Sequence, residues 1–454
     1  MMSGTLSLAA ESMCGVLHGS DLAFRGVSTD TRSVQPGELF IALQGPNFDG
    51  NEFVVLAAEN DAAGAVVSRE VSVDIPTIVV DDTLAALGKL AASWRQQLPA
   101  TVVGITGSNG KTTLKEMLAS CLAISAETIA THGNLNNEIG LPLMLSRIGD
   151  EHRYAVIEMG ANHAGEIAYL TSLAAPEVVV ITNAAPAHLE GFGSVEGVAR
   201  AKGEILAGAR RQDFAILNAD DDYFDYWASL CEGSDVVSFG LTAAADVCAS
   251  SIKFTGGGSK FKLHTPTGQV SVSLSLHGRH NILNACAAAA VAGSLGIDCK
   301  QIKQGLEAVQ PVGGRLAPVK SASGATLFDD TYNANPVSVQ AAAEFLAAQT
   351  GTSWLVLGDM AELGSDAELL HAHTGWVARE AGVDKLLAIG PLSRKTVESF
   401  GADGYWYESV SELVNSLQAA LGNDDVVLVK GSRSMGMERV VELLTDDYEQ
   451  VGSA

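Results

Sequence analysis

The sequence predicts an α/β protein in which parallel sheets are covered by helices. Short apolar runs rich in valine and isoleucine alternate along most of the chain with longer stretches that carry apolar residues at helical spacings of three and four. A glycine-rich turn at residues 104–113 connects one such run to one such stretch. Because parallel sheets bind ligands at the carboxyl ends of their strands, this turn also indicates where a site should lie.

The same pattern divides the chain into three segments. Its 454 residues exceed the roughly 100–200 residues of one domain. Residues 1–83 contain short apolar runs broken by turns and predict a small α/β domain. Residues 84–313 predict a central P-loop domain with a parallel sheet, resembling an ATPase, and residues 314–454 predict a Rossmann-like α/β domain. Gly313 and Gly314 offer a hinge at the second boundary, since glycine rotates at low cost.

The expected elements follow in chain order. The central domain begins with a helix at 84–98, and a second helix at 111–124 follows the glycine-rich turn. Alternating polar and apolar residues at 247–276 predict an antiparallel hairpin inserted in this domain, and small apolar residues at 285–297 predict a buried helix. We expect strands at 101–106, 154–159, 177–182 and 214–218, and in the last domain at 326–328, 354–357, 386–389 and 426–429.

Composition limits the partners and the compartment. The 53 acidic and 28 basic residues give a formal charge of −25, which argues against nucleic acid or an anionic membrane surface as partner. We expect neither membrane insertion nor a signal peptide, because long apolar runs and a basic N-terminal region are missing from the sequence. The six scattered cysteines are typical of a reducing compartment. We therefore expect a cytoplasmic enzyme, and a monomer because no coiled coil demands association.

The glycine-rich turn has the features of a phosphate-binding loop. It precedes a helix whose first backbone N–H groups would point at an anion, and Gly107 and Gly110 permit close approach of the backbone. Lys111 can reach the β- and γ-phosphates of ATP, and the hydroxyl of Thr112 can ligate Mg²⁺. Gly104 lies one position too early for the common spacing, so the interpretation depends on Thr-Gly-x-Asn-Gly-Lys-Thr in this context. The alternative is an ordinary turn between a strand and a helix.

Three further polar side chains are candidates for the same site. Glu158 ends a predicted strand, where a carboxylate can meet Mg²⁺ held by Thr112. His188 follows the next strand and can bind a second cation or orient a phosphate. Lys202 lies in a helical stretch. Each also has an ordinary structural interpretation, as a solvated strand-end acid, a lone histidine and a solvated cation.

A series of short motifs extends over nearly the whole chain. It comprises residues 106–113, 134–140, Glu158-Met159-Gly160, residues 183–188, residues 278–284 and Gly314-Arg315. In this order the motifs resemble those of the Mur ligases, the cytosolic ATP-dependent amide-forming enzymes of peptidoglycan precursor synthesis. A series of this kind is far more specific than any one of its members.

The resemblance implies a set of residues for ATP and Mg²⁺. Asn281 and Asn284 line the adenine side, Arg315 contacts phosphates, and either Asp329 or Asp330 holds the ribose. Lys202 falls where these ligases often carry a carbamylated lysine. The implied ATP-binding residues are Thr106, Gly107, Ser108, Asn109, Gly110, Lys111, Thr112, Thr113, Asn281, Asn284, Arg315 and Asp330. The implied metal ligands are Thr112, Glu158, His188 and carbamylated Lys202, and the implied catalytic residues are Lys111, His188, Lys202 and Arg315.

The two ends of the chain indicate the substrates within this family. Residues 27–32, 37–43 and 48–50 resemble the uridine-nucleotide-binding domain shared by the ligases that add the third residue and the D-Ala-D-Ala dipeptide. Residues 329–336, 357–364 and 430–434 resemble the dipeptide-adding ligase, and no Asp-Asn-Pro-Arg occurs. Asn335 and Pro336 could equally begin a helix. The implied substrate-binding residues are Ser28, Thr29, Arg32, Gly45, Asn47, Phe48, Asn134, Asn137, Tyr332 and Asn333.

The resemblance also implies the reaction. The terminal carboxylate of UDP-N-acetylmuramoyl-tripeptide attacks the γ-phosphate of ATP, and the amine of D-Ala-D-Ala then displaces phosphate from the acyl phosphate. Closure of the last domain would bring Arg315 and Asp330 to the nucleotide. The alternatives are an amino-acid-adding Mur-type or polyglutamate-type ligase and, from another class, a nucleotide-gated binding protein. The third residue of the peptide, diaminopimelate or lysine, is left open.

Overall fold

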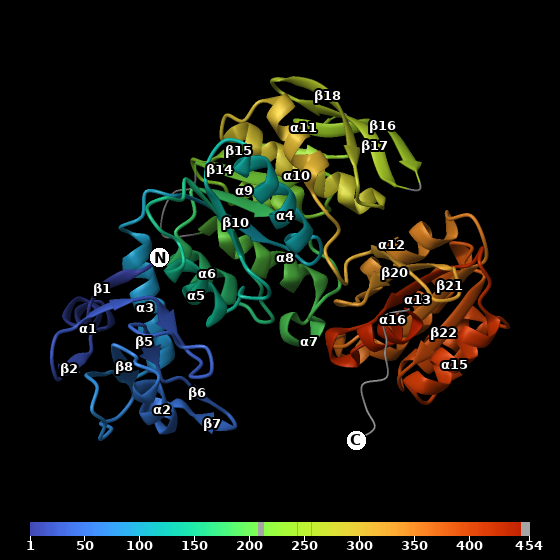
Figure 1. The fold of residues 1–454 in the computed structure, drawn as a ribbon. Coiled ribbons are helices and arrows are strands. Elements are labelled where there is room, and N and C mark those ends of the chain that lie inside the picture. The colour runs from blue at the N-terminus through green and yellow to red at the C-terminus, as the bar shows by residue number, and fades with distance from the viewer. Residues whose placement is uncertain (208–212, 243, 256, 446–454) are drawn as a thin grey trace.

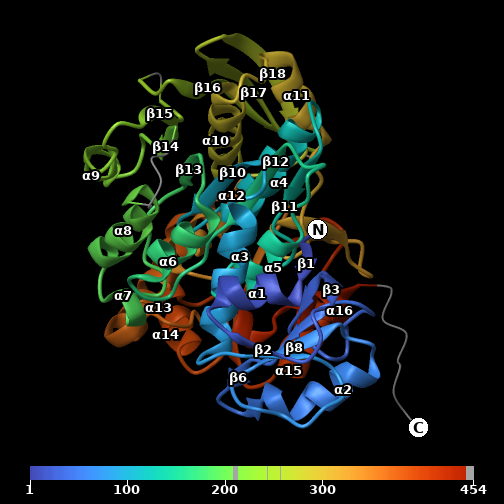
Figure 2. The ribbon, with the colours of Figure 1, turned by 90° about the vertical axis from the view of Figure 1, so that its left-hand side faces the viewer.

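The computed structural model describes residues 1–207, 213–242, 244–255 and 257–445, and it contains three larger sheets, one in each expected segment of the chain (Figure 1). This arrangement confirms the predicted α/β class with three α/β units. The first and last units lie on the same side of the central one, as the view turned by 90° also shows (Figure 2). Within the described residues, no helix is long and apolar enough to cross a membrane.

The N-terminal sheet has five strands in the order β2-β9-β8-β5-β4, which are parallel except for β2 at one edge. Its strands are β2 (Val16–His18), β4 (Val27–Ser28), β5 (Leu39–Ile41), β8 (Gly64–Val67) and β9 (Thr77–Val79). Two antiparallel pairs join β1 (Ser3–Thr5) to β3 (Ala23–Arg25), and β6 (Gln44–Gly45) to β7 (Phe48–Asp49). The helices here are α1 (Leu6–Met13) and α2 (Val54–Glu59).

The central sheet has nine strands in the order β11-β12-β10-β13-β14-β15-β16-β17-β18. The first seven of these are parallel, which agrees with the alternation of strands and helices in the sequence. They are β11 (Thr128–Ala130), β12 (Tyr154–Glu158), β10 (Thr101–Thr106), β13 (Val178–Ile181), β14 (Phe214–Asn218), β15 (Asp235–Gly240) and β16 (Val247–Thr255). Two antiparallel strands complete the sheet, β17 (Gly258–Thr265) and β18 (Gly268–Leu274).

The antiparallel pairing expected at residues 247–276 is confirmed, because β16 pairs with β17 and β17 pairs with β18 in antiparallel register. The segment forms three strands that continue the central sheet, because β16 pairs in parallel with β15 at Phe239 and Val247. One face of these strands is buried in the same apolar layer as the central strands, with Phe261, Leu263 and Val272 in it. The alternation in the sequence records this one-sided burial but does not reveal which sheet the strands join.

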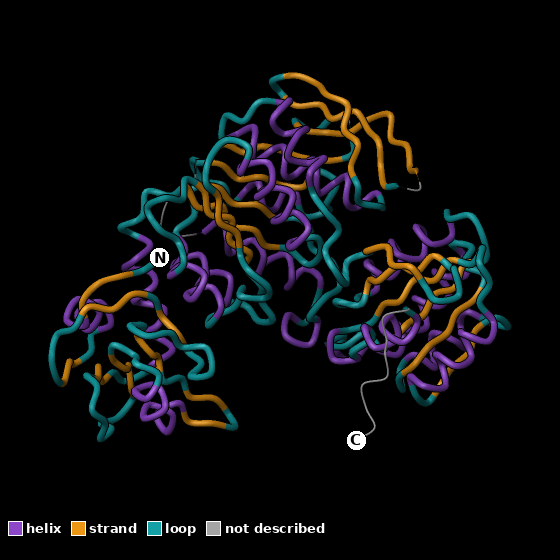
Figure 3. Tube along the Cα trace, in the orientation of Figure 1, coloured by secondary structure: helices purple, strands orange, loops and turns teal. Residues whose placement is uncertain are grey.

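Helices cover both faces of the central sheet (Figure 3). Along β10, Val103 and Ile105 belong to one apolar layer and Val102 belongs to the other, as the two-residue period of a strand requires. The helices are α3 (Thr83–Arg95), α4 (Lys111–Ala123), α5 (Gly140–Ser146), α6 (Glu166–Ala174), α7 (Leu189–Phe192), α8 (Val195–Gly203), α9 (Phe224–Ser229), α10 (Arg279–Ser294) and α11 (Cys299–Ala308). Helix α10 is the buried helix expected at 285–297, although it begins six residues earlier.

The C-terminal sheet has six strands in the order β19-β20-β24-β21-β22-β23, parallel except for β19. Its strands are β19 (Ala317–Lys320), β20 (Thr326–Asp330), β21 (Ser353–Gly358), β22 (Lys385–Ile389), β23 (Gly404–Tyr407) and β24 (Val426–Lys430). The helices are α12 (Pro336–Ala347), α13 (Ala367–Glu380), α14 (Ser393–Phe400), α15 (Val410–Ala420) and α16 (Glu438–Leu444). Apolar layers on both faces of this sheet match the predicted doubly wound fold.

Candidate active site

The predicted phosphate-binding loop lies between β10 and α4. Gly107 has a φ of +143°, and a Cβ on it would lie 1.9 Å from the Oγ1 of Thr182. Gly110 precedes α4 with a φ of +83°. Both glycines are therefore required by the turn. Gly104 lies inside β10, where a Cβ would come within 3.2 Å of Met159, so it serves strand packing and does not belong to the loop.

The ends of neighbouring strands hold this loop in place. Thr106 donates its hydroxyl to the carbonyl of Met159 at 3.0 Å, and Thr182 donates to the carbonyl of Asn109 at 2.7 Å. Asn183 accepts the backbone N–H of Ser108 on its carbonyl and that of Asn109 on its side chain, both at 3.0 Å. The backbone of the loop is thus fixed from outside. The amide N–H groups at the start of α4 have no partners within the helix and can meet phosphate oxygens.

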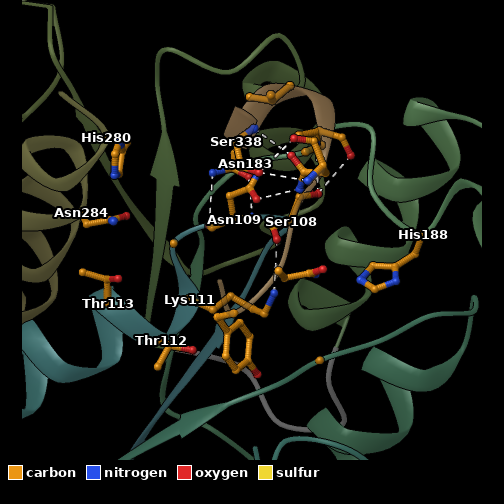
Figure 4. A pocket seen from close by; sticks show the side chains of 18 of the residues that line it. Ser108, Asn109, Lys111, Thr112, Thr113, Asn183, His188, His280, Asn284 and Ser338 are labelled. Carbon is orange, nitrogen blue, oxygen red and sulfur yellow. Dashed lines mark hydrogen bonds between the residues drawn. The ribbon is translucent and has the colours of Figure 1, made fainter. Parts of the chain in front are cut away.

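A cavity of about 1110 Å³ opens in front of the loop. It brings together most of the predicted ATP-binding residues with some of those predicted for substrate. Asn284 and His280 lie on one side of Lys111 and Thr112, and His188 lies on the other (Figure 4). The predicted residues that line it are Ser108, Asn109, Gly110, Lys111, Thr112, Thr113, Asn134, Asn137, Glu158, His188, Asn281, Asn284, Arg315, Asp330, Tyr332 and Asn333.

Thr112 and Glu158 form the part of the site that fits Mg²⁺. The Thr112 hydroxyl donates to Glu158 at 2.8 Å, and Asn136 donates to the other carboxylate oxygen at 2.8 Å. Glu158 is only 2% exposed, which excludes the solvated strand-end acid. In the described part of the chain, no group of three or more His, Cys, Asp or Glu side chains is arranged so that it could hold a metal ion by itself. Mg²⁺ commonly takes one or two carboxylates and completes its shell with phosphate oxygens and water, so this sparse donor set suits it.

Two side chains from the last segment reach the loop. Arg315 donates to the hydroxyl of Thr112 at 2.7 Å, and its guanidinium carbon lies 4.0 Å from the centre of the Tyr332 ring. Asn335 donates its amide to the side chain of Asn109 at 2.8 Å. Asn335 also accepts the N–H of Ser338 and so caps α12, in which Pro336 is the first residue. The helix-capping interpretation of Asn335 is therefore confirmed, and the same side chain also contacts the loop.

The two candidate aspartates for ribose have different surroundings. Asp329 accepts the N–H of Gly314 at 2.9 Å and the hydroxyl of Thr331 at 2.6 Å, so it holds the chain beside Arg315. Asp330 lines the cavity and forms an ion pair of 2.7 Å with the buried Lys430. This difference favours Asp330 as the residue that faces a ligand.

His188 lines the cavity immediately before α7, and Lys202 lies in the following helix, α8. The Nδ1 atom of His188 contacts the carboxylate of Glu362, from the last segment. Burial lowers the pKa of His188, while Glu362 opposes that shift. Lys202 is 2% exposed, and burial together with the charge of Lys111 lowers its pKa to about 7. Lys202 is therefore not the solvated cation that its helical context alone suggests.

The ammonium group of Lys111 bends back over its own loop. Its Nζ donates to the carbonyl of Gly107 at 2.7 Å and to that of Ser108 at 3.4 Å. Burial lowers the pKa of Lys111, and the charge of Arg315 lowers it further against the opposing effect of Glu158. An anion bound between Lys111 and Arg315 would stabilise the charged form of Lys111 against burial and against the charge of Arg315. A phosphate group is such an anion.

The residues predicted to bind the uridine nucleotide lie in the N-terminal unit and do not line the cavity. Ser28 is buried and donates to the carbonyl of Asp30 at 3.1 Å. Arg32 is highly exposed, and its hydrogen bonds to Asp30 lower the pKa of that carboxyl to about 2. Phe48, on the β6-β7 hairpin, is 54% exposed. The role of these residues, with Thr29, Gly45 and Asn47, stays a prediction.

Thr182 and four further supporting residues were not among the predicted site residues. Asn136, Asn183, Glu362 and Lys430 each contact a predicted residue or the loop itself. All four lie inside motifs that the sequence already singled out, at or after the carboxyl end of a strand. Their position in these motifs could therefore have identified them as candidates. Their contacts could not be predicted, because the partner residues lie far away in the sequence.

Family comparisons match three stretches of the chain. The family described as Mur ligase middle domain matches residues 105–292. That described as Mur ligase, glutamate ligase domain matches residues 314–433, and that described as Mur ligase family, catalytic domain matches residues 23–95.

Several similar proteins match this chain over nearly its full length. The UDP-N-acetylmuramoyl-tripeptide--D-alanyl-D-alanine ligase of Escherichia coli (strain K12) is 45% identical, over 98% of this chain and 99% of its own. The enzyme of that name from Bacillus subtilis (strain 168) is 34% identical, over 98% and 99%. A crystal structure of MurF from Acinetobacter baumannii, 36% identical, superposes with a TM-score of 0.92 over 98% of this chain and 99% of that one.

More distant structures share the fold. MurF ligase from Thermotoga maritima in complex with ADP is 28% identical, with a TM-score of 0.83 over 92% of this chain and 97% of that one. A folylpolyglutamate synthase from Mycobacterium tuberculosis complexed with ADP and AMPPCP is 17% identical, with a TM-score of 0.64 over 80% and 95%. The latter likeness concerns the fold alone.

Proposed function

The chain belongs to the Mur ligase family, and we propose which of its residues carry the reaction. The protein is an ATP- and Mg²⁺-dependent ligase that joins D-Ala-D-Ala to UDP-N-acetylmuramoyl-tripeptide in peptidoglycan synthesis. The observation that carries this function is the 45% identity to the ligase of that name over 98% of this chain. That match includes both ends of the chain, where the two substrates are expected to bind.

In the first step, the tripeptide carboxylate attacks the γ-phosphate of ATP and releases ADP. Two anions approach each other in this step, so the site must supply positive charge. We assign that task to Lys111, whose ammonium group contacts the loop, and to Arg315, which reaches the Thr112 hydroxyl from the last domain. Mg²⁺ held by Thr112 and Glu158 would neutralise charge on the phosphate oxygens when bound. We expect Asp330 to bind the ribose and Asn281 and Asn284 to contact the adenine.

In the second step, the amine of D-Ala-D-Ala attacks the acyl carbon and phosphate leaves. The acyl phosphate must be kept from water until the amine arrives. Tyr332 and Asn333 lie on the loop after β20 and line the cavity, so we assign the dipeptide to their side of it. We assign the uridine nucleotide to the N-terminal unit, with Ser28, Thr29 and Arg32 on one loop and Gly45, Asn47 and Phe48 on the β6-β7 hairpin.

We propose further that the ligase acts as a monomer in the cytoplasm. ATP is its co-substrate, and all six cysteines are free thiols, as a reducing compartment favours. Sedimentation equilibrium would give the mass of one chain, 47.1 kDa, across a range of concentrations. A larger mass at low concentration would contradict the monomer.

A panel of amines tests the acceptor. UDP-N-acetylmuramoyl-tripeptide and Mg-ATP are incubated with D-Ala-D-Ala, meso-diaminopimelate, lysine or glutamate, and ADP release is measured. We expect ADP release to depend on the UDP-tripeptide and to be fastest with D-Ala-D-Ala. Preference for a single amino acid would indicate an amino-acid-adding ligase. ATP hydrolysis that is independent of the UDP-tripeptide would instead indicate a nucleotide-gated binding protein.

A further inference from the structure

Glu362 links the last domain to the part of the central domain that carries His188. It lies in the loop that follows β21, between Gly358 and the short helix at 364–366. His188 immediately precedes α7, after β13. The two residues are 174 positions apart in the chain, yet the Nδ1 atom of His188 contacts the Glu362 carboxylate.

The contact has a backbone component as well as a side-chain component. The N–H of Glu190 donates to the carbonyl of Glu362 at 3.2 Å, so the loop after β21 is held against the first turn of α7 at two points. Both His188, with a φ of +53°, and Glu362, with a φ of +60°, adopt the left-handed conformation. Residues other than glycine rarely adopt it, and it persists where surrounding contacts define it.

The contact with Glu362 determines which ring nitrogen of His188 carries the proton. A carboxylate accepts hydrogen bonds, so its contact with Nδ1 requires the proton to be on Nδ1. In the neutral ring, Nε2 then keeps a lone pair that is free to bind a cation or to accept a proton. Histidines that bind metal ions generally have such a carboxylate or carbonyl partner on their other nitrogen, and losing that partner typically costs 10- to 100-fold. The ring points toward the side of the pocket where Lys111 lies (Figure 4).

We propose that Glu362 is a positioning residue that fixes the tautomer and orientation of His188 when the last domain meets the central one. The last domain then completes the site on two sides, with Arg315 at Thr112 and Glu362 at His188. The inference rests on the proposed role of His188 in the ligase reaction.

A double-mutant cycle tests whether Glu362 acts through His188. We expect Glu362→Ala to lower kcat about 10- to 100-fold with a much smaller change in the KM for ATP, because the nucleotide contacts of the loop remain. Glu362→Gln should retain more activity, since its amide oxygen still accepts a hydrogen bond. In a His188→Ala background, Glu362→Ala should have no further effect. Multiplicative losses in the double variant would overturn the proposal.

The matched control is Glu368→Gln, which removes an exposed carboxylate from the first turn of α13 in the same domain. It should leave both kcat and KM unchanged. Thermal unfolding of each variant separates loss of the fold from loss of the contact, and Glu362→Gln provides a second variant if Glu362→Ala does not fold. Wild-type activity for Glu362→Gln and Glu362→Ala alike would also overturn the proposal.

A readout independent of turnover is the tautomer itself. In protein with ¹⁵N-labelled histidine, the His188 signals are identified by their absence in His188→Gln. We expect the wild type to carry the proton on Nδ1 and Glu362→Ala to gain the form with the proton on Nε2. The same tautomer in both would contradict the proposal. If the wild-type protein made no pentapeptide product, the ligase function would fail; if it made product while the Glu362 variants behaved like wild type, only the positioning role would fail.

Discussion

The Lys111 ammonium group lies inside its own loop, where burial disfavours its charge and a bound anion would restore it. We expect Lys111→Ala to reduce ADP formation by at least about 10²- to 10³-fold, because it removes a charged donor from the transferring phosphoryl group. The variant should keep the thermal midpoint of the wild type. The half-buried Lys395, which lies in α14 outside the cavity, serves as control, and Lys395→Ala should be active. A stable Lys111→Ala variant with near-normal turnover would contradict the assignment of the phosphate site.

Lys202 is predicted to react with CO₂. Only the neutral amine can form a carbamate, and burial lowers the pKa of Lys202 to about 7, so the neutral fraction grows as the pH rises through that value. We expect a carbamate signal in ¹³C NMR of protein equilibrated with labelled bicarbonate, stronger above pH 7 than below it. The signal should be missing in Lys202→Met. An equal signal in Lys202→Met would assign the carbamate to another amine.

Single residues show what could and what could not be predicted from the sequence. Glu158 and Lys202 were candidates from their positions and motifs, and both are buried in the structure. Their burial could not be predicted, because a run of residues does not reveal which elements cover it. Phe192, whose ring centre lies 5.1 Å from the Lys202 ammonium, comes from a different helix. The surroundings of a buried side chain such as Lys202 therefore depend on how several elements pack together.

Among the elements, the turn from β10 to α4 leaves no room for a side chain at Gly107. We expect Gly107→Ala to abolish ATP binding, because its φ of +143° disfavours a side chain and the new Cβ would meet Thr182. The free energy of unfolding should fall by about 1–3 kcal/mol, as for residues held in strained backbone conformations. Isothermal titration and chemical unfolding measure the two effects.

Gly165→Ala is the matched control for that substitution. Gly165 precedes α6 with a φ of +88°, but a Cβ on it would have no heavy atom within 4 Å. It should therefore show the conformational cost without the clash and should bind ATP normally. Loss of ATP binding in Gly165→Ala would mean that the effect of Gly107→Ala does not report on the loop.

Strongly apolar strands and long helices were the elements that the sequence could predict. The expected strand at 101–106 and helix at 111–124 match β10 and α4 to within one residue. Short strands such as β11 and β19 escaped prediction, because three or four residues carry too little periodicity. Residues 247–276 belong to the central sheet because β16 pairs with β15. Alternation of polar and apolar residues does not specify which strand is the neighbour.

Across the whole molecule, the last domain contributes directly to the site of the central one. We expect Arg315→Ala to lower kcat about 10²- to 10³-fold while the Kd for ATP changes little, because Arg315 contacts Thr112 from the closing domain and Lys111 and the loop remain. Stopped-flow measurement of nucleotide binding and steady-state kinetics separate the two quantities. Equal losses in ATP binding and turnover would contradict a role in closure.

Contacts between domains were the least predictable part. The motif containing Arg315 indicated a role at the phosphates, and the structure places it on Thr112, 203 residues earlier. The pairs Asn335 with Asn109 and Glu362 with His188 were not foreseen, although all four residues lie in motifs. Motifs identify which residues belong to a site, whereas the pairing between them depends on how the domains pack.

The most direct test of carboxylate activation at this site follows an oxygen atom. The terminal carboxylate of UDP-N-acetylmuramoyl-tripeptide is labelled with ¹⁸O, and the products formed with Mg-ATP and D-Ala-D-Ala are analysed by mass spectrometry. An acyl phosphate formed at the Lys111 loop predicts UDP-N-acetylmuramoyl-pentapeptide together with inorganic phosphate that carries one ¹⁸O atom from the carboxylate. Pentapeptide accompanied by unlabelled phosphate would contradict carboxylate activation, and labelled phosphate without pentapeptide would contradict transfer of the acyl group to the dipeptide.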